Sequence, residues 1–356
     1  MIGKWLRRMV SPPRASLLFE VTARCNLQCP HCYNVWKGGA AYSTDELPTS
    51  TAVEVIRKAV RESNCRTFTF TGGEPTLRED LEQLVREASS LCERVNLISN
   101  GTLLDAARVV SLREAGVSIF ELPLNSADGR MHNRMAGGVD CFERVTSAAA
   151  EIRGQGAGLA FVFVGTAENI DGWEDALKLG IALGAQGFLL NRYNAGGERR
   201  DRPESLMPSV GQLRRALGIA ERYATEYGVG ISASVPVPPC LIDPKDFPHV
   251  GMGYCPVGTD RAYWTIDPLG NIRPCNHSST VLGNIRDEPF RRIARSRKLT
   301  EFTKALPPSC SPCEMRHECR GGCKAAAEVC AGSPNLREPF LELNRQRADA
   351  GCSDRR

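Results

Sequence analysis

The chain has 356 residues, of which 42% are hydrophobic and 24% are charged. This is the balance of an ordinary globular protein, long enough for a full core and a second, smaller module. The net charge of +4 is too small to indicate nucleic acid as a partner. Residues 1–14 contain no apolar run that could form a signal sequence or a membrane span, so we expect a cytoplasmic protein without a membrane partner.

Cysteine is frequent, with fifteen residues in the chain. A disulfide scaffold is typical of short secreted chains, and nothing in this sequence directs export. In a reducing compartment, clustered cysteines more often hold a metal ion or an iron–sulfur cluster. The isolated cysteines are expected to be small buried hydrophobic residues, and they are Cys65, Cys92 and Cys141.

Short apolar runs alternate with helical segments from residue 16 to about residue 200. The runs are continuous rather than alternating, which is typical of parallel strands buried on both faces. The predicted strands are 17–21, 67–70, 95–98, 119–124, 160–164 and 188–190. Six strand–helix repeats predict an α/β fold with a partial (β/α)6 TIM-like barrel. Such a barrel carries its chemistry on the loops at the carboxyl ends of the strands.

Capping patterns predict where several helices begin. Thr51, Thr76 and Asp171 each stand three residues before a glutamate, an arrangement in which the capping oxygen satisfies free backbone amides. Ser209 stands three residues before a glutamine in the same way. The helix that Ser209 opens is expected to end near Tyr227.

The composition changes after the proline-rich segment 235–239. From Cys240 onward, cysteine, proline and glycine are frequent, hydrophobic periodicity is weak, and nine of the fifteen cysteines occur. The sequence therefore predicts four parts, namely an N-terminal extension (1–15), a barrel (16–205), a helix with a linker (206–239) and a cysteine-rich domain with a C-terminal tail (240–356).

Cys25, Cys29 and Cys32 follow the first predicted strand, where a barrel displays its active site. Their spacing also suits one stripe of a buried helix, but Pro30 would remove a hydrogen bond and clash with the preceding turn. Three thiolates within eight residues suit a 4Fe–4S cluster with one iron free of protein ligands. Such an iron can bind a reactant, whereas a cluster with four cysteine ligands only carries electrons.

This Cys-x3-Cys-x2-Cys pattern resembles the hallmark of the radical S-adenosylmethionine (SAM) superfamily. Gly72-Gly73-Glu74-Pro75, at the end of the second predicted strand, resembles the turn that holds the amino group of the methionine moiety. Glycines let the backbone approach a ligand closely, and the Glu74 carboxylate is expected to complete the site. Ser99-Asn100-Gly101, after the third predicted strand, resembles the ribose-contacting position.

Other positions depart from the family pattern or match it in two ways. Relatives usually carry an aromatic residue just before the third cysteine. This chain has His31 there, so Tyr33 is expected to supply the stacking face for adenine. A serine that binds the methionine carboxylate in relatives corresponds to either Asn125 or Ser126. Arg144 is either the arginine that pairs with this carboxylate or a solvated helix charge.

A second set of cysteines resembles the SPASM extension of radical SAM enzymes, which holds auxiliary iron–sulfur clusters. It has the pattern Cys255-x14-Gly270-x4-Cys275, a tight hairpin at 267–272, and then Cys310-x2-Cys313-x5-Cys319-x3-Cys323. Structural zinc is the alternative occupant.

The resemblance implies two ligand sets for the auxiliary clusters. The first comprises Cys255, Cys275 and Cys323, with Cys240 as the candidate for the fourth ligand. The second comprises Cys310, Cys313 and Cys319. Its closing cysteine would be expected near residues 340–341, where none occurs. The fourth ligand of the second set is therefore Cys330, Cys352 or none.

The resemblance also implies an activity. SAM, reduced through the 4Fe–4S cluster by a donor such as flavodoxin or ferredoxin, would yield a 5′-deoxyadenosyl radical that takes a hydrogen atom from the substrate. A ribosomally made peptide is the first expectation for the substrate, with a small molecule such as a haem-type precursor, sugar or antibiotic intermediate as the alternative. Many peptide-modifying relatives carry an N-terminal leader-binding module, whereas only about fifteen residues precede the first strand here. This weakens the expectation of a peptide substrate without removing it, because a separate protein can bind the leader.

A protein that binds a cluster or zinc without catalysis is the alternative of a different class. No general base can be identified from the sequence. Four residues near predicted strand ends face either the substrate or the rim of the barrel, and they are Glu121, Asn191, Arg192 and Tyr193.

Overall fold

The computed structural model describes residues 15–353 except 36 and 38–44, and the side chains of the last helix only as far as Gln346. The expected N-terminal extension thus lies almost wholly outside the described residues. The strands are β1 (Ser16–Glu20), β2 (Thr67–Thr71), β3 (Arg94–Ile98), β4 (Ile119–Pro123), β5 (Gly158–Gly165), β6 (Gly187–Arg192), β7 (Gly230–Ala233), β8 (Gly251–Met252), β9 (Tyr263–Ile266), β10 (Asn271–Arg273) and β11 (Gly283–Asn284).

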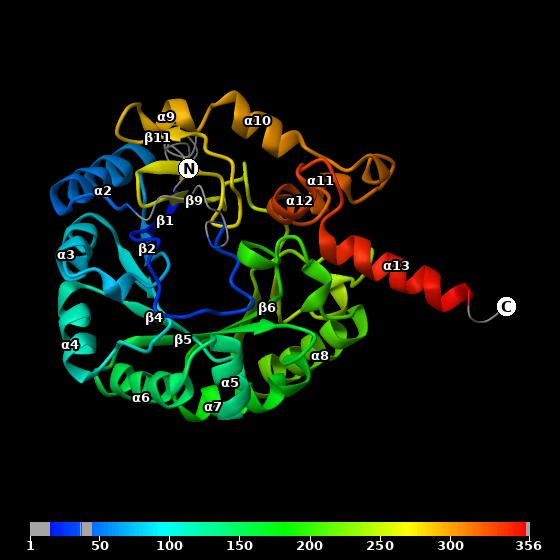
Figure 1. The fold of residues 1–356 in the computed structure, drawn as a ribbon, viewed down its shortest axis with the longest axis horizontal. Helices are drawn as coiled ribbons and strands as arrows, with labels where there is room; N and C mark the ends of the chain where they lie inside the picture. Colours follow the sequence, from blue (N-terminus) through cyan, green and yellow to red (C-terminus); the bar gives the residue numbers. More distant parts are fainter. Residues whose placement is uncertain (1–14, 36, 38–44, 354–356) are drawn as a thin grey trace, which may run out of the picture.

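The helices of the N-terminal two thirds form an outer ring around the curved sheet (Figure 1). They are α2 (Thr49–Ser63), α3 (Leu81–Leu91), α4 (Ala106–Ala115), α5 (Gly129–Ala136), α6 (Cys141–Gly154), α7 (Trp173–Ala182) and α8 (Val210–Tyr227). The later helices are α9 (Phe290–Ile293), α10 (Arg297–Lys304), α11 (Arg316–Cys319), α12 (Lys324–Ala331) and α13 (Pro339–Ser353). None of the helices in the described part is long and apolar enough to cross a membrane.

All the strands belong to one sheet with the order β11-β10-β9-β1-β2-β3-β4-β5-β6-β7-β8. The strands from β1 to β8 pair in parallel with their neighbours, which confirms the predicted partial barrel. β9 pairs in parallel with β1 and antiparallel with β10, so the predicted hairpin at 267–272 is present. The cysteine-rich part therefore extends the barrel sheet, and the segment expected to be a helix with a linker contributes β7.

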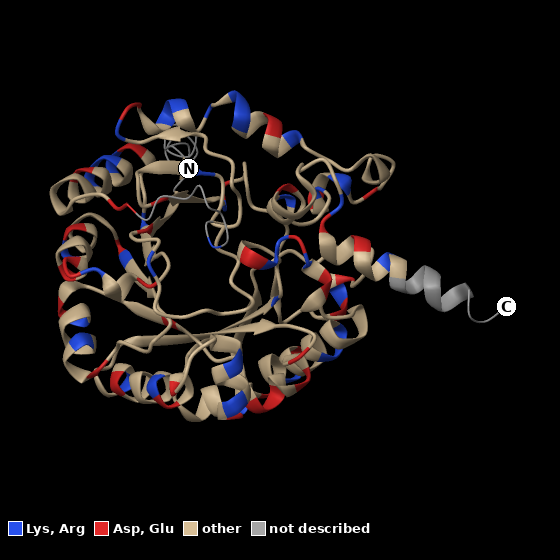
Figure 2. Cartoon of the chain, in the orientation of Figure 1, with Lys and Arg blue, Asp and Glu red and all other residues tan. Residues whose placement is uncertain are grey.

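The side chains of the barrel strands alternate between two environments. In β5, every second residue is buried, and Phe161 and Phe163 lie under the outer helices with Trp173 of α7. The residues between them, Val162 and Val164, are half-buried and line the space inside the barrel. Charged side chains are concentrated on the outer helices (Figure 2). The core thus lies between sheet and helices, which leaves the inner face free for a ligand.

Only one of the predicted helix starts is correct in detail. Ser209 accepts a hydrogen bond from the Gln212 amide and the Gln212 side chain returns one, and this capping box opens a helix that ends at Tyr227 as expected. The other three patterns fail. Thr51 lies inside α2, Thr76 lies in a short 3-10 helix and bonds Glu74, and Asp171 lies in another 3-10 helix before α7. Thr76 and Asp171 form hydrogen bonds with other partners in place of the expected caps, Thr76 with Glu74 and Asp171 with Gln212 and Arg215.

Candidate active site and cluster-binding sites

The cysteine loop after β1 brings three thiols together. Cys25, Cys29 and Cys32 lie close enough that neighbouring thiols help raise the pKa of Cys29, which burial brings to about 12. The Cys29 thiol also donates to the backbone carbonyl of Ala136 at the end of α5, at 3.1 Å. Lys37 donates to the Leu27 carbonyl at 2.8 Å and so fixes the loop from the other side. The loop thus holds three thiols at the carboxyl edge of the sheet.

The turn after β2 packs directly on this loop. The amides of Gly73 and Glu74 donate to the carbonyls of Thr22 and Arg24, both at 2.8 Å. A Cβ on Gly73 would lie 2.1 Å from the Arg24 carbonyl oxygen, and one on Gly72, whose φ is +151°, would lie 2.4 Å from that of Thr22. The sequence predicts that these glycines let the backbone approach a ligand closely. In the structure, the close approach that requires them is to the cysteine loop.

The carboxylate of Glu74 is fully buried between the loops after β2 and β3. It accepts hydrogen bonds from the Thr76 amide (3.1 Å), the Ser99 hydroxyl (2.8 Å) and the Asn100 amide (2.7 Å). Each of these bonds is charge-assisted when the carboxyl is ionised. Glu74 and Ser99 therefore join the loops after β2 and β3, because burial leaves no oxygen of Glu74 free for solvent or ligand.

Asn100 links the cysteine loop to the loop after β3. Its side-chain amide donates a hydrogen bond to the Asn26 side chain at 2.8 Å. The Asn26 side chain donates to the Thr102 hydroxyl at 2.9 Å, and this hydroxyl donates back to the Asn100 side-chain oxygen at 2.7 Å. The Arg144 guanidinium, from α6, lies 3.5 Å from the Thr102 carbonyl and is otherwise exposed. The structure brings these residues together next to the three thiols, and it places Arg144 at the outer edge of the group.

The two candidates after β4 are both engaged by backbone groups. The Asn125 side chain accepts a hydrogen bond from the Val164 amide at 3.0 Å, and this bond ties β4 to β5. The Ser126 hydroxyl accepts from the Asp128 amide at 3.0 Å, just before α5. Asn125 therefore positions strands. Ser126 keeps a hydroxyl proton that a ligand can accept.

A cavity of about 280 Å³ opens inside the barrel at this end. Its lining includes Glu121 of β4, for which burial raises the pKa to about 7. Asn191 and Arg192 of β6 also line it, whereas Tyr193 is buried outside the lining. Glu121 is the acidic residue that the described lining contains. Arg192 forms an ion pair with Glu338 in which both side chains are fully buried.

Tyr33 and His277 meet in the cavity wall. Their rings stack with centroids 4.1 Å apart and planes inclined by 22°. One face of Tyr33 is thus covered by the C-terminal part of the chain, which the sequence analysis did not anticipate for an adenine-stacking residue. His31 lines the same cavity, and its buried Nδ1 has no hydrogen-bond partner among the described residues. Both rings lie beside the cysteine loop.

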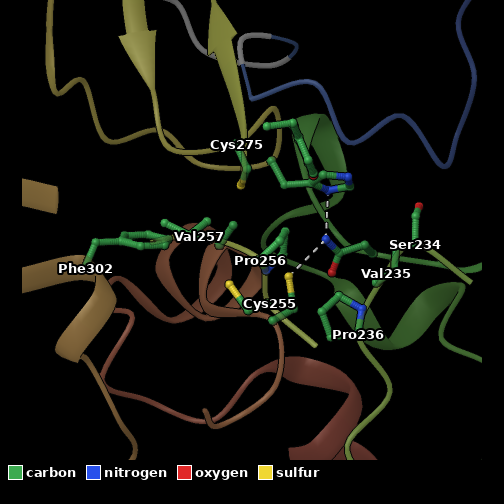
Figure 3. Close-up of a pocket in the computed structure, with 13 residues that line it drawn as sticks. Ser234, Val235, Pro236, Cys255, Pro256, Val257, Cys275 and Phe302 are labelled. Atoms are coloured by element: carbon green, nitrogen blue, oxygen red, sulfur yellow. Dashed lines mark hydrogen bonds between the residues drawn. The ribbon is translucent and has the colours of Figure 1, made fainter. Parts of the chain in front are cut away.

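Cys255, Cys275 and Cys323 converge on a second, much smaller pocket of about 40 Å³ (Figure 3). Burial raises the pKa of Cys323 to about 12, and burial together with the neighbouring thiols of Cys323 and Cys255 raises the pKa of Cys275. Asn194 donates one hydrogen bond to His277 Nδ1 at 2.8 Å and one to the Cys323 sulfur at 3.5 Å, which are the dashed lines in Figure 3. Sequence reasoning had no signal for Asn194 or His277, because neither belongs to a motif.

A third pocket, of about 290 Å³, contains the remaining cysteines of the SPASM-like pattern. Cys310, Cys313 and Cys319 line it as expected. Cys240 lines it too, close enough to influence the pKa of Cys319. The sequence predicts Cys240 in the pocket of Cys255. The structure instead places Cys240 in the pocket of Cys319.

Cys330 lies in neither pocket. It is on α12, and its thiol points to the Ala195 carbonyl at 3.8 Å. Cys352, the other candidate, lies where the structure does not describe side chains. Cys65 and Cys141 are buried as predicted, and Cys92 is half-buried beside Cys65.

These groups fit the cofactors that the sequence suggests. All the described cysteines are free thiols, and burial raises the pKa of several well above the ordinary value, which is unfavourable for thiolates unless iron binds them. No three Cys, His, Asp or Glu side chains of the described residues are arranged to hold a single metal ion. In the barrel cavity, the buried His31 Nδ1 and Asn194 Oδ1 lack partners among these residues and offer polar contacts to a ligand.

Comparison with known families decides the assignment. A model of the radical SAM superfamily matches residues 19–180, and a model of the SPASM iron–sulfur cluster-binding domain matches residues 255–320. The chain has a radical SAM domain followed by a SPASM domain. Radical SAM proteins use SAM and a 4Fe–4S cluster, and SPASM domains bind auxiliary iron–sulfur clusters, so the cofactors inferred from the sequence are confirmed.

Two solved structures share the fold across almost the whole chain. SuiB of Streptococcus suis, bound to the precursor peptide SuiA, is 15% identical with a TM-score of 0.72, covering 96% of this chain and 78% of SuiB. A histidine-tagged form of anSMEcpe with bound AdoMet is 18% identical with a TM-score of 0.71, covering 93% of this chain and 94% of anSMEcpe. At these identities the likeness concerns the fold alone.

Proposed function

We propose that this protein is a radical SAM enzyme that modifies a ribosomally made peptide. The observation that carries the proposal is the arrangement at one end of the barrel, where the loop with three clustered thiols also contributes His31 and Tyr33 to the lining of a cavity. The likeness to SuiB, solved with a precursor peptide, supports a peptide as the substrate. When bound, SAM and the clusters supply a 5′-deoxyadenosyl radical that takes a hydrogen atom from the substrate.

Cys25, Cys29 and Cys32 would hold the 4Fe–4S cluster. Their loop would keep its shape when the cluster binds, because the backbone of Gly73 and Glu74 is already hydrogen-bonded to it. The set has three thiols and no fourth, which leaves one iron for SAM. The cysteine loop would thus bind and orient SAM at the mouth of the cavity.

The SAM site would use groups around this loop. Tyr33 and His31 offer ring faces to the adenine, and Asn100 and Ser126 lie on the loops after β3 and β4 with polar groups for the ribose and methionine parts. Arg144 would pair with the methionine carboxylate from the edge of the site. Glu74, Ser99 and Asn125 would act by holding these loops in place, since their own polar atoms are engaged.

The substrate would enter the inner part of the cavity. Most of the strand residues that face it are apolar, including Leu18, Ile98 and Val162, and they would exclude water from the reacting carbon. Glu121 is placed to receive a proton, because burial raises the pKa of its carboxyl to about 7. An external donor such as flavodoxin or ferredoxin would supply electrons, and a separate protein would bind the leader.

The test is mass spectrometry of precursor peptides after anaerobic turnover with SAM and dithionite. The proposal expects a mass change in the peptide that requires SAM and is lost in Cys29→Ala. If SAM were cleaved while no peptide changed and a small molecule was consumed instead, the peptide assignment would be wrong. If nothing was cleaved and the purified protein carried zinc, the enzyme assignment would fail.

A further inference from the structure

Four cysteines line the pocket between α11 and the segment after β7. Cys310, Cys313 and Cys319 come from the short SPASM-like run, and Cys240 reaches the pocket from seventy residues earlier in the chain. Cys240 and Cys310 both influence the pKa of Cys319, and Cys310 also influences that of Cys240. Four free thiols thus surround one space, a complete donor set for an iron–sulfur cluster.

The segment that presents Cys240 is fixed on both sides. The amides of Leu241 and Ile242 donate to the Pro238 carbonyl at 3.0 and 3.2 Å, which forms a tight turn around Cys240. Ile242 is fully buried and anchors the far side of the turn. A thiol held this way needs little rearrangement to bind iron.

The same pocket contains Leu341 at the start of α13. This is the position where the sequence pattern led us to expect a closing cysteine. Leu341 is buried, and a leucine cannot bind iron. Arg345, one turn later on α13, instead forms a hydrogen bond with the Cys240 thiol. α13, which would carry the expected cysteine at position 341, therefore lies beside Cys240, a thiol from another part of the chain.

We propose that Cys240 is the fourth ligand of the second auxiliary cluster, in place of a cysteine at position 341. The first auxiliary cluster then keeps three cysteine ligands, Cys255, Cys275 and Cys323. No other cysteine lines its pocket in the described part of the chain. This inference rests on the proposed iron–sulfur chemistry and adds the identity of the ligand.

The consequence concerns the first auxiliary cluster. Its pocket and the barrel cavity share five lining residues, among them Asn194, Tyr263 and His277. An iron without a cysteine ligand would therefore face the side from which the substrate enters. The second cluster, closed by four thiols, would only transfer electrons.

The experiment compares iron, sulfide and electron paramagnetic resonance (EPR) spectra of reconstituted full-length variants. In a background with Cys25, Cys29 and Cys32 replaced by alanine, only auxiliary clusters contribute. Adding Cys240→Ala should remove the second cluster's iron or convert its reduced 4Fe–4S signal to that of an oxidised 3Fe–4S cluster. The matched control, Cys330→Ala in the same background, should keep the iron content and spectrum of the parent.

Unchanged iron and spectra in Cys240→Ala, or loss of a cluster in Cys330→Ala, would overturn the proposal. If Cys240→Ala does not fold, the double variant Cys240→Ala, Leu341→Cys should recover a folded, iron-loaded protein. Failure of the double variant to load iron would also contradict the proposal that Cys240 is the fourth ligand. Formation of 5′-deoxyadenosine by the unaltered protein tests the proposed function separately.

Discussion

Gly73 and Glu74 are two neighbouring residues that hold different parts of the site. Gly73 lets the turn after β2 pack against the backbone of Arg24, and Glu74 joins that turn to Ser99 and Asn100. Neither role needs a direct contact with SAM. A family motif that relatives associate with a ligand is here explained by contacts between loops of the protein itself.

Gly73→Ala should therefore damage the first cluster more than the fold. The added Cβ would lie 2.1 Å from the Arg24 carbonyl and would push the cysteine loop away, at a cost of about 1–3 kcal/mol. We expect loss of iron from the site of Cys29 and a lower melting temperature. Gly154→Ala, at the end of α6 where a Cβ meets nothing within 4 Å, is the control and should keep both. Equal iron loading in the two variants would contradict this reading.

The buried carboxyl of Glu121 should make the stability of the protein depend on pH. Burial raises the pKa of its carboxyl to about 7 in the folded protein, above the value of about 4.3 in an unfolded chain. The folded state therefore holds the proton more tightly, and this stabilisation is lost as the pH rises through 7. Glu121→Gln stays neutral, so the variant should gain stability relative to the wild type by on the order of 2 kcal/mol between about pH 5 and pH 8, allowing for partial exposure.

Denaturant unfolding of the two proteins at both pH values measures this difference. Glu79→Gln, which alters an exposed acid next to α3, serves as the control and should show no such trend. A stability difference that does not change with pH would mean that the Glu121 carboxyl is ionised throughout.

At the element scale, β6 and the start of α13 are joined through a buried ion pair. Arg192 pairs with Glu338, donates to the Pro236 carbonyl at 2.9 Å and lies over the Phe340 ring at 4.6 Å. Glu338 also accepts a hydrogen bond from the Cys323 amide at 3.1 Å. This buried ion pair thus connects the barrel to the auxiliary-cluster region, in addition to the hydrogen bonds of Asn194 to His277 and Cys323.

Glu338→Ala should weaken both parts at once. It leaves the Arg192 charge buried without its partner, which costs about 3–5 kcal/mol, and it frees the backbone next to Cys323. We expect a lower melting temperature and less auxiliary iron. Glu301→Ala removes a surface ion pair to Arg297 in α10 and should cost under about 1 kcal/mol. If the Glu338 and Glu301 variants had equal melting temperatures, the buried Arg192–Glu338 pair would not stabilise the fold.

The sequence predicted the elements well because strong signals repeat along it. Each of the six predicted strands is present within a few residues, and the Ser209 capping box opens α8 as expected. The other caps failed, since Thr76 and Asp171 form hydrogen bonds with Glu74 and with Gln212 and Arg215 instead. The partners of Asp171 are more than forty residues away, and only the folded chain brings them close.

At the scale of the whole molecule, motif spacing predicted the groups of cysteines but not every member. Cys25, Cys29 and Cys32 are neighbours in sequence and in space. Cys240 is far from its pocket partners along the chain, so spacing could not assign it, and Asn194 and His277 carry no pattern at all. What the sequence could not predict is which distant loops meet where the cysteine-rich part closes against the barrel.

The most direct test of the account is whether the three thiols of the cysteine loop support radical chemistry. Reconstituted protein, reduced with dithionite under anaerobic conditions and given SAM, should release 5′-deoxyadenosine. Cys25→Ala, Cys29→Ala and Cys32→Ala should each reduce this release to the level without protein, while Cys65→Ala, which alters a buried thiol outside the three pockets, should retain it. Undiminished 5′-deoxyadenosine from the three loop variants would contradict the central claim.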